Sequence, residues 1–78
     1  MSKGERYFTL HLDSEVLAKF HEALRRYQEQ YRQPPTRLLL NPEARGEPIS
    51  VLIEAAKAAG ITVEREKFVL VWEAWVGG

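Results

Sequence analysis

A chain of 78 residues with no cysteine and with equal numbers of acidic and basic side chains excludes several classes of protein at once. Without cysteine there are no disulfides, no thiolate catalysis and no zinc or iron–sulfur site built on sulfur ligands. The formal net charge of zero provides no overall field to attract nucleic acid or an acidic membrane surface. So short a chain is expected to form one domain that gains stability by self-association.

No segment of the chain predicts export or membrane insertion. No apolar run approaches the roughly 20 residues of a membrane span, and the charged start Met1–Arg6 is not followed by the apolar stretch of a signal peptide. We therefore expect a cytoplasmic protein with a flexible N-terminus over residues 1–5 and a single domain over residues 6–76. Arginine outnumbers lysine, and asparagine and methionine are scarce, a composition associated with thermophilic sources.

The first two predicted elements are a strand and a long helix. Residues Arg6–Leu12 alternate between apolar and polar side chains, which predicts a strand with one face in the core. Asp13 and Ser14 supply an N-cap for a helix that runs to about Arg32 and stops before Pro34–Pro35. Its core stripe, at steps of three and four residues, is predicted to be Leu17, Phe20, Leu24, Tyr27 and Tyr31.

A second strand and a second helix follow. Residues Thr36–Leu40 form a short apolar run after the two prolines, which is typical of a buried central strand. The segment Asn41–Gly46 has the composition of a loop. The second helix is expected to begin near Pro48, and Gly60 fits the position after its last turn. Its buried stripe is predicted to be Ile49, Leu52, Ile53 and Ala56.

The C-terminal part of the chain contains two more predicted strands. These are Ile61–Glu64 and Phe68–Val76, joined by the polar Arg65–Lys67 as a hairpin. The order is therefore β-α-β-α-β-β, an α/β (α+β) two-layer sandwich with both helices on one face of a four-stranded mixed sheet.

The same order of elements occurs in small sulfur-carrier domains, which need a cysteine, and in the C-terminal domain of bacterial translation initiation factor three, which is strongly basic. This chain has neither property, so the order alone assigns no family.

The last predicted strand has apolar side chains on both of its alternating faces, interrupted only by Glu73. If the helices cover one face of the sheet, the other face exposes apolar side chains, and contiguous apolar patches mark interfaces. Trp72 is then expected beneath the helices and Trp75 between two copies of the chain. The predicted interface is Tyr7, Leu39, Val69, Val71 and Trp75. The alternative is that this strand is central and that the termini cover the far face.

The two histidines are candidates for catalysis or metal binding. His11 and Asp13 form a His-x-Asp pair, but Asp13 is already assigned to the helix cap and no third ligand has a suitable spacing. His21 lies one step off the apolar stripe, where a boundary or surface position is expected. We predict that neither histidine is catalytic or metal-bound and that the chain has no cofactor.

Two further surfaces are candidate binding sites. Arg45 and Gly46 precede a helix N-terminus, a place where anions bind, but Glu47 repels anions and a plain loop explains the composition. A local group of arginines beside Tyr27 and Tyr31 offers the cations and stacking surfaces that single-stranded nucleic acid requires. The arginines of this group are Arg25, Arg26, Arg32 and Arg37.

Two functional hypotheses follow. The first is a non-enzymatic interaction or assembly module, a homodimer or a subunit with a protein partner, that self-associates through the outer sheet face. The second is a small nucleic-acid-binding protein that uses the arginine and tyrosine group.

Overall fold

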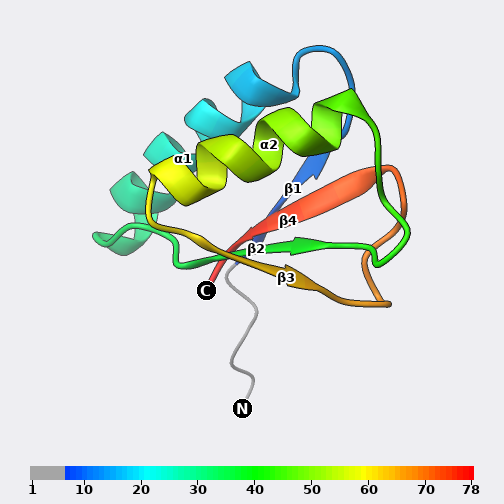
Figure 1. The fold of residues 1–78 in the computed structure, drawn as a ribbon. Coiled ribbons are helices and arrows are strands. Elements are labelled where there is room, and N and C mark those ends of the chain that lie inside the picture. Colours follow the sequence, from blue (N-terminus) through cyan, green and yellow to red (C-terminus); the bar gives the residue numbers. More distant parts are fainter. Residues whose placement is uncertain (1–6) are drawn as a thin grey trace.

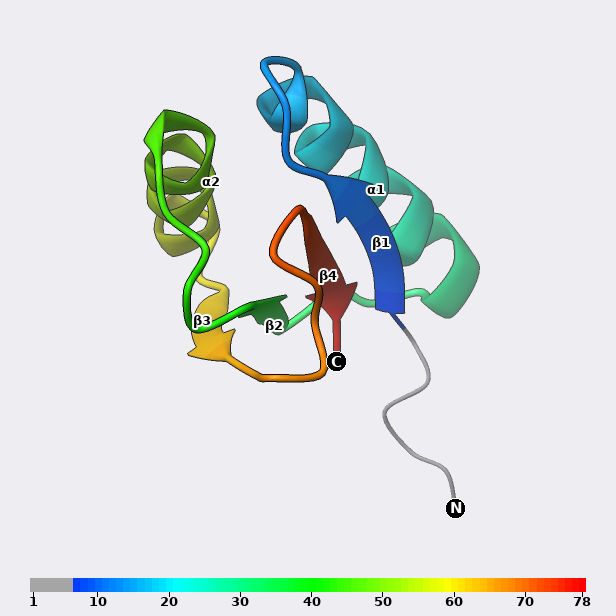
Figure 2. The same ribbon diagram turned by 90° about the vertical axis from the view of Figure 1, so that its right-hand side faces the viewer.

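The computed structural model describes residues 7–78, in which two helices pack on one face of a four-stranded sheet (Figures 1 and 2). The strands are β1 (Tyr7–His11), β2 (Arg37–Leu40), β3 (Thr62–Arg65) and β4 (Glu73–Gly77), and the helices are α1 (Val16–Tyr31) and α2 (Glu47–Ala58). The predicted α+β two-layer sandwich and its order of elements are confirmed. The expected flexible residues 1–5 lie outside the described residues.

The order of strands in the sheet is β1-β4-β2-β3. Strands β2 and β3 are parallel, whereas β4 is antiparallel to both of its neighbours, β1 and β2. The predicted C-terminal hairpin is therefore wrong, because β3 and β4 are not adjacent. The connection between them spans residues 66–72, longer than a tight hairpin turn, and it lets β4 cross to a central position where both of its edges are paired.

The predicted strand Phe68–Val76 is wrong in its first part, because β4 begins only at Glu73. Residues 66–72 form instead a connection that we call the β3–β4 loop. Two backbone turns, each closed by an N–H···O=C bond of 3.2 Å, interrupt the extended conformation. The side-chain amide of Asn41, just after β2, donates to the backbone carbonyl of Val69 at 2.7 Å and holds the loop against the end of that strand.

Helix α1 occupies nearly the predicted range. It ends at Tyr31, and Arg32 closes it in the left-handed conformation with φ 61°. Its start differs from the prediction, because Glu15 is the N-cap residue and no side chain caps the helix. The carboxylate of Asp13 accepts a hydrogen bond from the backbone N–H of Glu15 at 2.9 Å, so it shapes the turn before the helix.

The core-facing stripe of α1 is turned slightly from the predicted one. Leu17 is 38% exposed, while Leu24 and Tyr31 are half-buried. The buried face of α1 is rotated in this way because Val16 and Ala23, rather than Leu17, point toward the sheet and α2. The buried side chains of α1 are Val16, Phe20, Ala23 and Tyr27.

Strand β2 and helix α2 follow the predictions closely. All three leucines of β2 are buried, and the strand is central. Helix α2 buries Ile49, Leu52 and Ala56, with Ile53 half-buried. Gly60 stands just after the helix with φ 77°, a conformation that glycine adopts without strain.

Candidate functional site

The outer face of the sheet, away from the helices, is partly covered by the chain itself. Leu38 and Leu40 belong to the core on the helix side, so Leu39 between them points to the outer face. Leu39 is nevertheless only 2% exposed, and Val69 is fully buried. The β3–β4 loop lies at the end of the sheet where β2 and β3 end and β4 begins (Figures 1 and 2), and the ring of its Phe68 lies 5.2 Å from that of Trp75. The prediction that Leu39 and Val69 would be exposed in a single chain is therefore wrong.

The prediction for Trp72 is wrong, whereas Trp75 lies on the outer face of the sheet as predicted, opposite Leu39 of the neighbouring strand β2. Trp72 was expected beneath the helices, but it stands in the loop and is 58% exposed. Trp75 is half-buried between the rings of Tyr7 and Phe68, at centroid distances of 6.0 and 5.2 Å. Val71 is 47% exposed but also lies in the loop rather than on the sheet.

Exposed apolar side chains are concentrated in the β3–β4 loop. Among the described residues, six large apolar side chains are exposed, and four of them belong to the β3–β4 loop. The ring contacts of Trp75 connect the loop to the first strand. We call this set the outer apolar patch, and it consists of Tyr7, Phe68, Leu70, Val71, Trp72 and Trp75.

Both histidines are exposed side chains. His11 is exposed on β1, and the neighbouring Asp13 is bound by the ammonium group of Lys19 at 2.6 Å, a hydrogen bond that lowers the pKa of this carboxyl. His21 is exposed, with its ring 5.8 Å from that of Phe20. Within residues 7–78, no group of three or more His, Cys, Asp and Glu side chains is arranged to hold a metal ion.

Three of the four arginines of the predicted nucleic-acid site are paired with carboxylates. The pairs are Arg25 with Glu29 at 3.7 Å, Arg26 with Glu22 at 3.2 Å and Arg37 with Glu64 at 2.8 Å. Tyr27 is only 1% exposed and Tyr31 is half-buried, so neither presents an open ring face for a base. Because its charges are balanced and its rings are packed, this group does not favour nucleic-acid binding.

The predicted anion site lies at the start of α2. Gly46 is the N-cap residue with φ 122°, and Arg45 beside it is exposed. The first turn carries Glu47, whose negative charge opposes an anion, and Pro48 removes one backbone donor. The geometry adds no further group that points to a ligand there.

Comparisons with protein-family models, with curated proteins and with solved structures found no match. Neither helix in the described part of the chain has the length and apolar character that crossing a membrane requires. The outer apolar patch is thus the candidate site with the largest concentration of exposed apolar side chains, and its chemistry is that of a contact surface.

Proposed function

We propose that this chain is a non-enzymatic interaction module that self-associates, with the outer apolar patch as its contact surface. The observation that supports this most directly is the concentration of exposed apolar side chains in residues 68–72. Removing apolar surface from water contributes about 25 cal/mol per Å². Monomeric domains seldom leave a contiguous apolar patch in water, and those that do use it for contact.

A second copy of the chain is the partner that we propose for this surface. The formal net charge is zero, so two copies approach without net repulsion. The six side chains of the patch are uncharged, and the carboxylate of Glu73 beside them accepts the indole N–H of Trp75 at 3.2 Å. Uncharged apolar side chains of this kind can pack against the same side chains of a second copy. A domain of 78 residues also gains more from association than a larger one, because its own core is small.

The test is to replace Trp72, a residue that is 58% exposed, by a charged residue. Trp72→Glu should leave the fold intact and weaken association by about 30-fold or more, since central aromatic side chains carry roughly 2 kcal/mol or more of binding free energy. Size exclusion with light scattering at micromolar concentration measures the change as a fall in mass.

The matched control is Val51→Glu, which introduces the same charge at a 37% exposed position on α2 outside the patch. Its mass should equal that of the unmodified chain. A Trp72→Glu variant that keeps the original mass would show that the patch is not the contact. An unmodified chain with the mass of one copy would show that the chain does not self-associate.

A further inference from the structure

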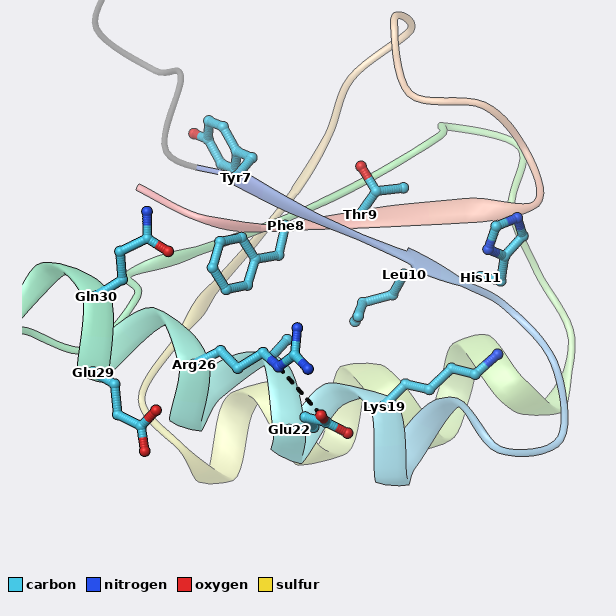
Figure 3. A pocket seen from close by; sticks show the side chains of 11 residues that line it. Tyr7, Phe8, Thr9, Leu10, His11, Lys19, Glu22, Arg26, Glu29 and Gln30 are labelled. Carbon is cyan, nitrogen blue, oxygen red and sulfur yellow. Dashed lines mark ion pairs between the residues drawn. The ribbon is translucent and has the colours of Figure 1, made fainter.

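The free edge of β1 lies in an open groove. Strand β1 is an outer strand of the sheet, paired with β4 on one side only. A groove of about 920 Å³ runs along its other side, lined by every residue of β1 and by one face of α1 (Figure 3). The lining residues of α1 are Lys19, Glu22, Ala23, Arg26, Glu29 and Gln30.

The backbone of β1 presents hydrogen-bonding groups to this groove. The N–H of Leu12 donates to the carbonyl of Trp72 at 3.0 Å, in continuation of the β1–β4 register. Alternate residues of an antiparallel strand point their N–H and C=O groups to the same side, so those of Tyr7, Thr9 and His11 point away from β4. Such a row of N–H and C=O groups is a template for another extended strand.

The opposite edge of the sheet, β3, is protected, whereas no residue of the described range 7–78 covers the edge of β1. Arg65 of β3 donates to the carbonyls of Asn41 and Ala44 at 2.8 and 2.9 Å, and Glu64 is paired with Arg37. Charged side chains and prolines are the usual means by which an edge strand avoids pairing. Strand β1 has the sequence YFTLH and contains no Asp, Glu, Lys, Arg or Pro.

Two copies of β1 are complementary when they run antiparallel about Thr9. In that register Thr9 lies opposite Thr9 of the second copy, and Tyr7 lies opposite His11. Phe8 lies opposite Leu10 on the helix side. Apolar and Thr–Thr cross-strand pairs of this kind stabilise antiparallel sheets.

The charges on the groove face of α1 have the same symmetry. In chain order they are Lys19, Glu22, Arg26 and Glu29, with alternating signs. A two-fold axis at position 24 places Lys19 of one copy opposite Glu29 of the other, and Glu22 opposite Arg26. Within one chain these side chains already form the pairs Lys19–Asp13, Glu22–Arg26 and Arg25–Glu29, so contacts across the axis add to or replace these pairs. Figure 3 shows Lys19 at the His11 end of the groove and Glu29 at the Tyr7 end, with Glu22 and Arg26 between them. An axis through the middle of β1 therefore also passes the middle of this charged row.

From the open edge and the matching symmetry of strand and helix, we infer that a second copy of this chain docks in the groove. The two β1 strands pair antiparallel and join two sheets of four strands into one sheet of eight, with the two α1 helices antiparallel across the axis. This contact uses the edge of the sheet and shares only Tyr7 with the outer apolar patch.

The first experiment introduces a thiol at the proposed axis, which is possible because the chain contains no cysteine. Facing residues of a hydrogen-bonded antiparallel pair have Cα atoms about 5.5 Å apart, but their Cβ atoms, about 5 Å apart, lie beyond the about 3.5–4.5 Å of an unstrained disulfide, so a short bismaleimide is used to join the two thiols. This crosslinker should convert most of a Thr9→Cys variant into a covalent dimer on a non-reducing gel. Thr62→Cys, at an exposed position on the opposite edge strand, is the matched control and should stay largely uncrosslinked.

The second experiment removes one backbone donor from the edge. Thr9→Pro eliminates an N–H that points away from β4, and proline is tolerated at such edge positions, so the fold should persist as judged by circular dichroism. The mass in solution should fall to half that of the unmodified chain, whereas Thr9→Val, which keeps the N–H and the branched shape, should leave it unchanged. The inference is overturned if Thr9→Cys does not crosslink above the Thr62→Cys level, or if Thr9→Pro folds and keeps the original mass. Neither outcome decides whether the outer apolar patch is a contact, because that proposal is tested by Trp72→Glu.

Discussion

Arg37 and Glu64 connect the neighbouring strands β2 and β3 by two hydrogen bonds, of 2.8 and 3.1 Å, from one guanidinium to one carboxylate. The hydrogen bonds from Arg37 hold the pKa of Glu64 below its ordinary value, and those to Glu64 raise the pKa of Arg37. A carboxyl whose pKa is lower in the folded than in the unfolded state stabilises the fold only while it is ionised. The pair therefore contributes stability above about pH 4.3, the pKa of an unperturbed glutamate.

We predict that this contribution disappears as the pH falls from about 4.3 through the lowered pKa of Glu64. In Glu64→Gln the free energy of unfolding should be lower than that of the unmodified chain at neutral pH and should decrease less steeply in acid. Denaturant unfolding at a series of pH values measures both effects. Glu54→Gln, at an exposed position on α2, is the control and should keep the original pH dependence. Equal slopes for Glu64→Gln and the unmodified chain would contradict the prediction.

Helix α1 is anchored by a side chain that its periodicity identified correctly. Phe20 is fully buried between the sheet and α2, so Phe20→Ala should leave a cavity and cost about 3–5 kcal/mol of the free energy of unfolding. That is a large part of the about 5–15 kcal/mol that stabilises a typical domain. The melting temperature should fall sharply or the variant should not fold.

The same helix supplies graded controls for Phe20→Ala. Leu24 is half-buried and Leu17 is 38% exposed, so Leu24→Ala should cost less than Phe20→Ala, and Leu17→Ala least of all. Chemical denaturation of the three variants gives the order. A larger loss for Leu17→Ala than for Phe20→Ala would mean that the helix faces the sheet with a different side.

The elements that the sequence predicted well depend on local patterns. Helices α1 and α2 and strands β1 and β2 follow from apolar spacing and from the prolines and glycine at their ends, all of which lie within one element. Even there, the predicted buried face of α1 was rotated slightly from the face that the structure buries. Residues Val16 and Leu17 are both apolar, and only packing decides which of them is buried.

The β3–β4 loop could not be predicted because distant residues decide its conformation. Five consecutive apolar residues, Phe68–Trp72, fit a central strand as well as a loop. The hydrogen bond from Asn41 to Val69 and the burial of Val69 exist only when β2 lies beside the loop. The predicted exposure was affected in the same way, since Leu39 and Val69 were expected to be exposed and are buried, while Phe68, Leu70 and Trp72 are the exposed residues. The sequence did contain evidence against a hairpin. The segment Arg65–Lys67 has no glycine or asparagine, the residues that tight hairpin turns favour.

At the scale of the whole molecule, the two proposed contacts involve different parts of the same sheet, one its edge and the other its outer face. The groove contact extends the sheet at the edge of β1, whereas the patch contact covers its outer face. Each is a contact between identical surfaces related by a two-fold axis. If the two axes are perpendicular and intersect, two such contacts close an assembly of four chains, and closed symmetric assemblies of this type are common among soluble oligomers.

This arrangement predicts how the mass responds when the two surfaces are changed together. The unmodified chain should have the mass of four copies at micromolar concentration, and Trp72→Glu and Thr9→Pro should each reduce it to two, because each removes one contact and leaves the other. The double variant should be a single chain of 9.0 kDa. Light scattering after size exclusion distinguishes the three masses, and circular dichroism confirms that each variant is folded. If the double variant has the same mass as one of the single variants, the two substitutions act on one contact, and either the groove or the patch has been assigned to the wrong surface.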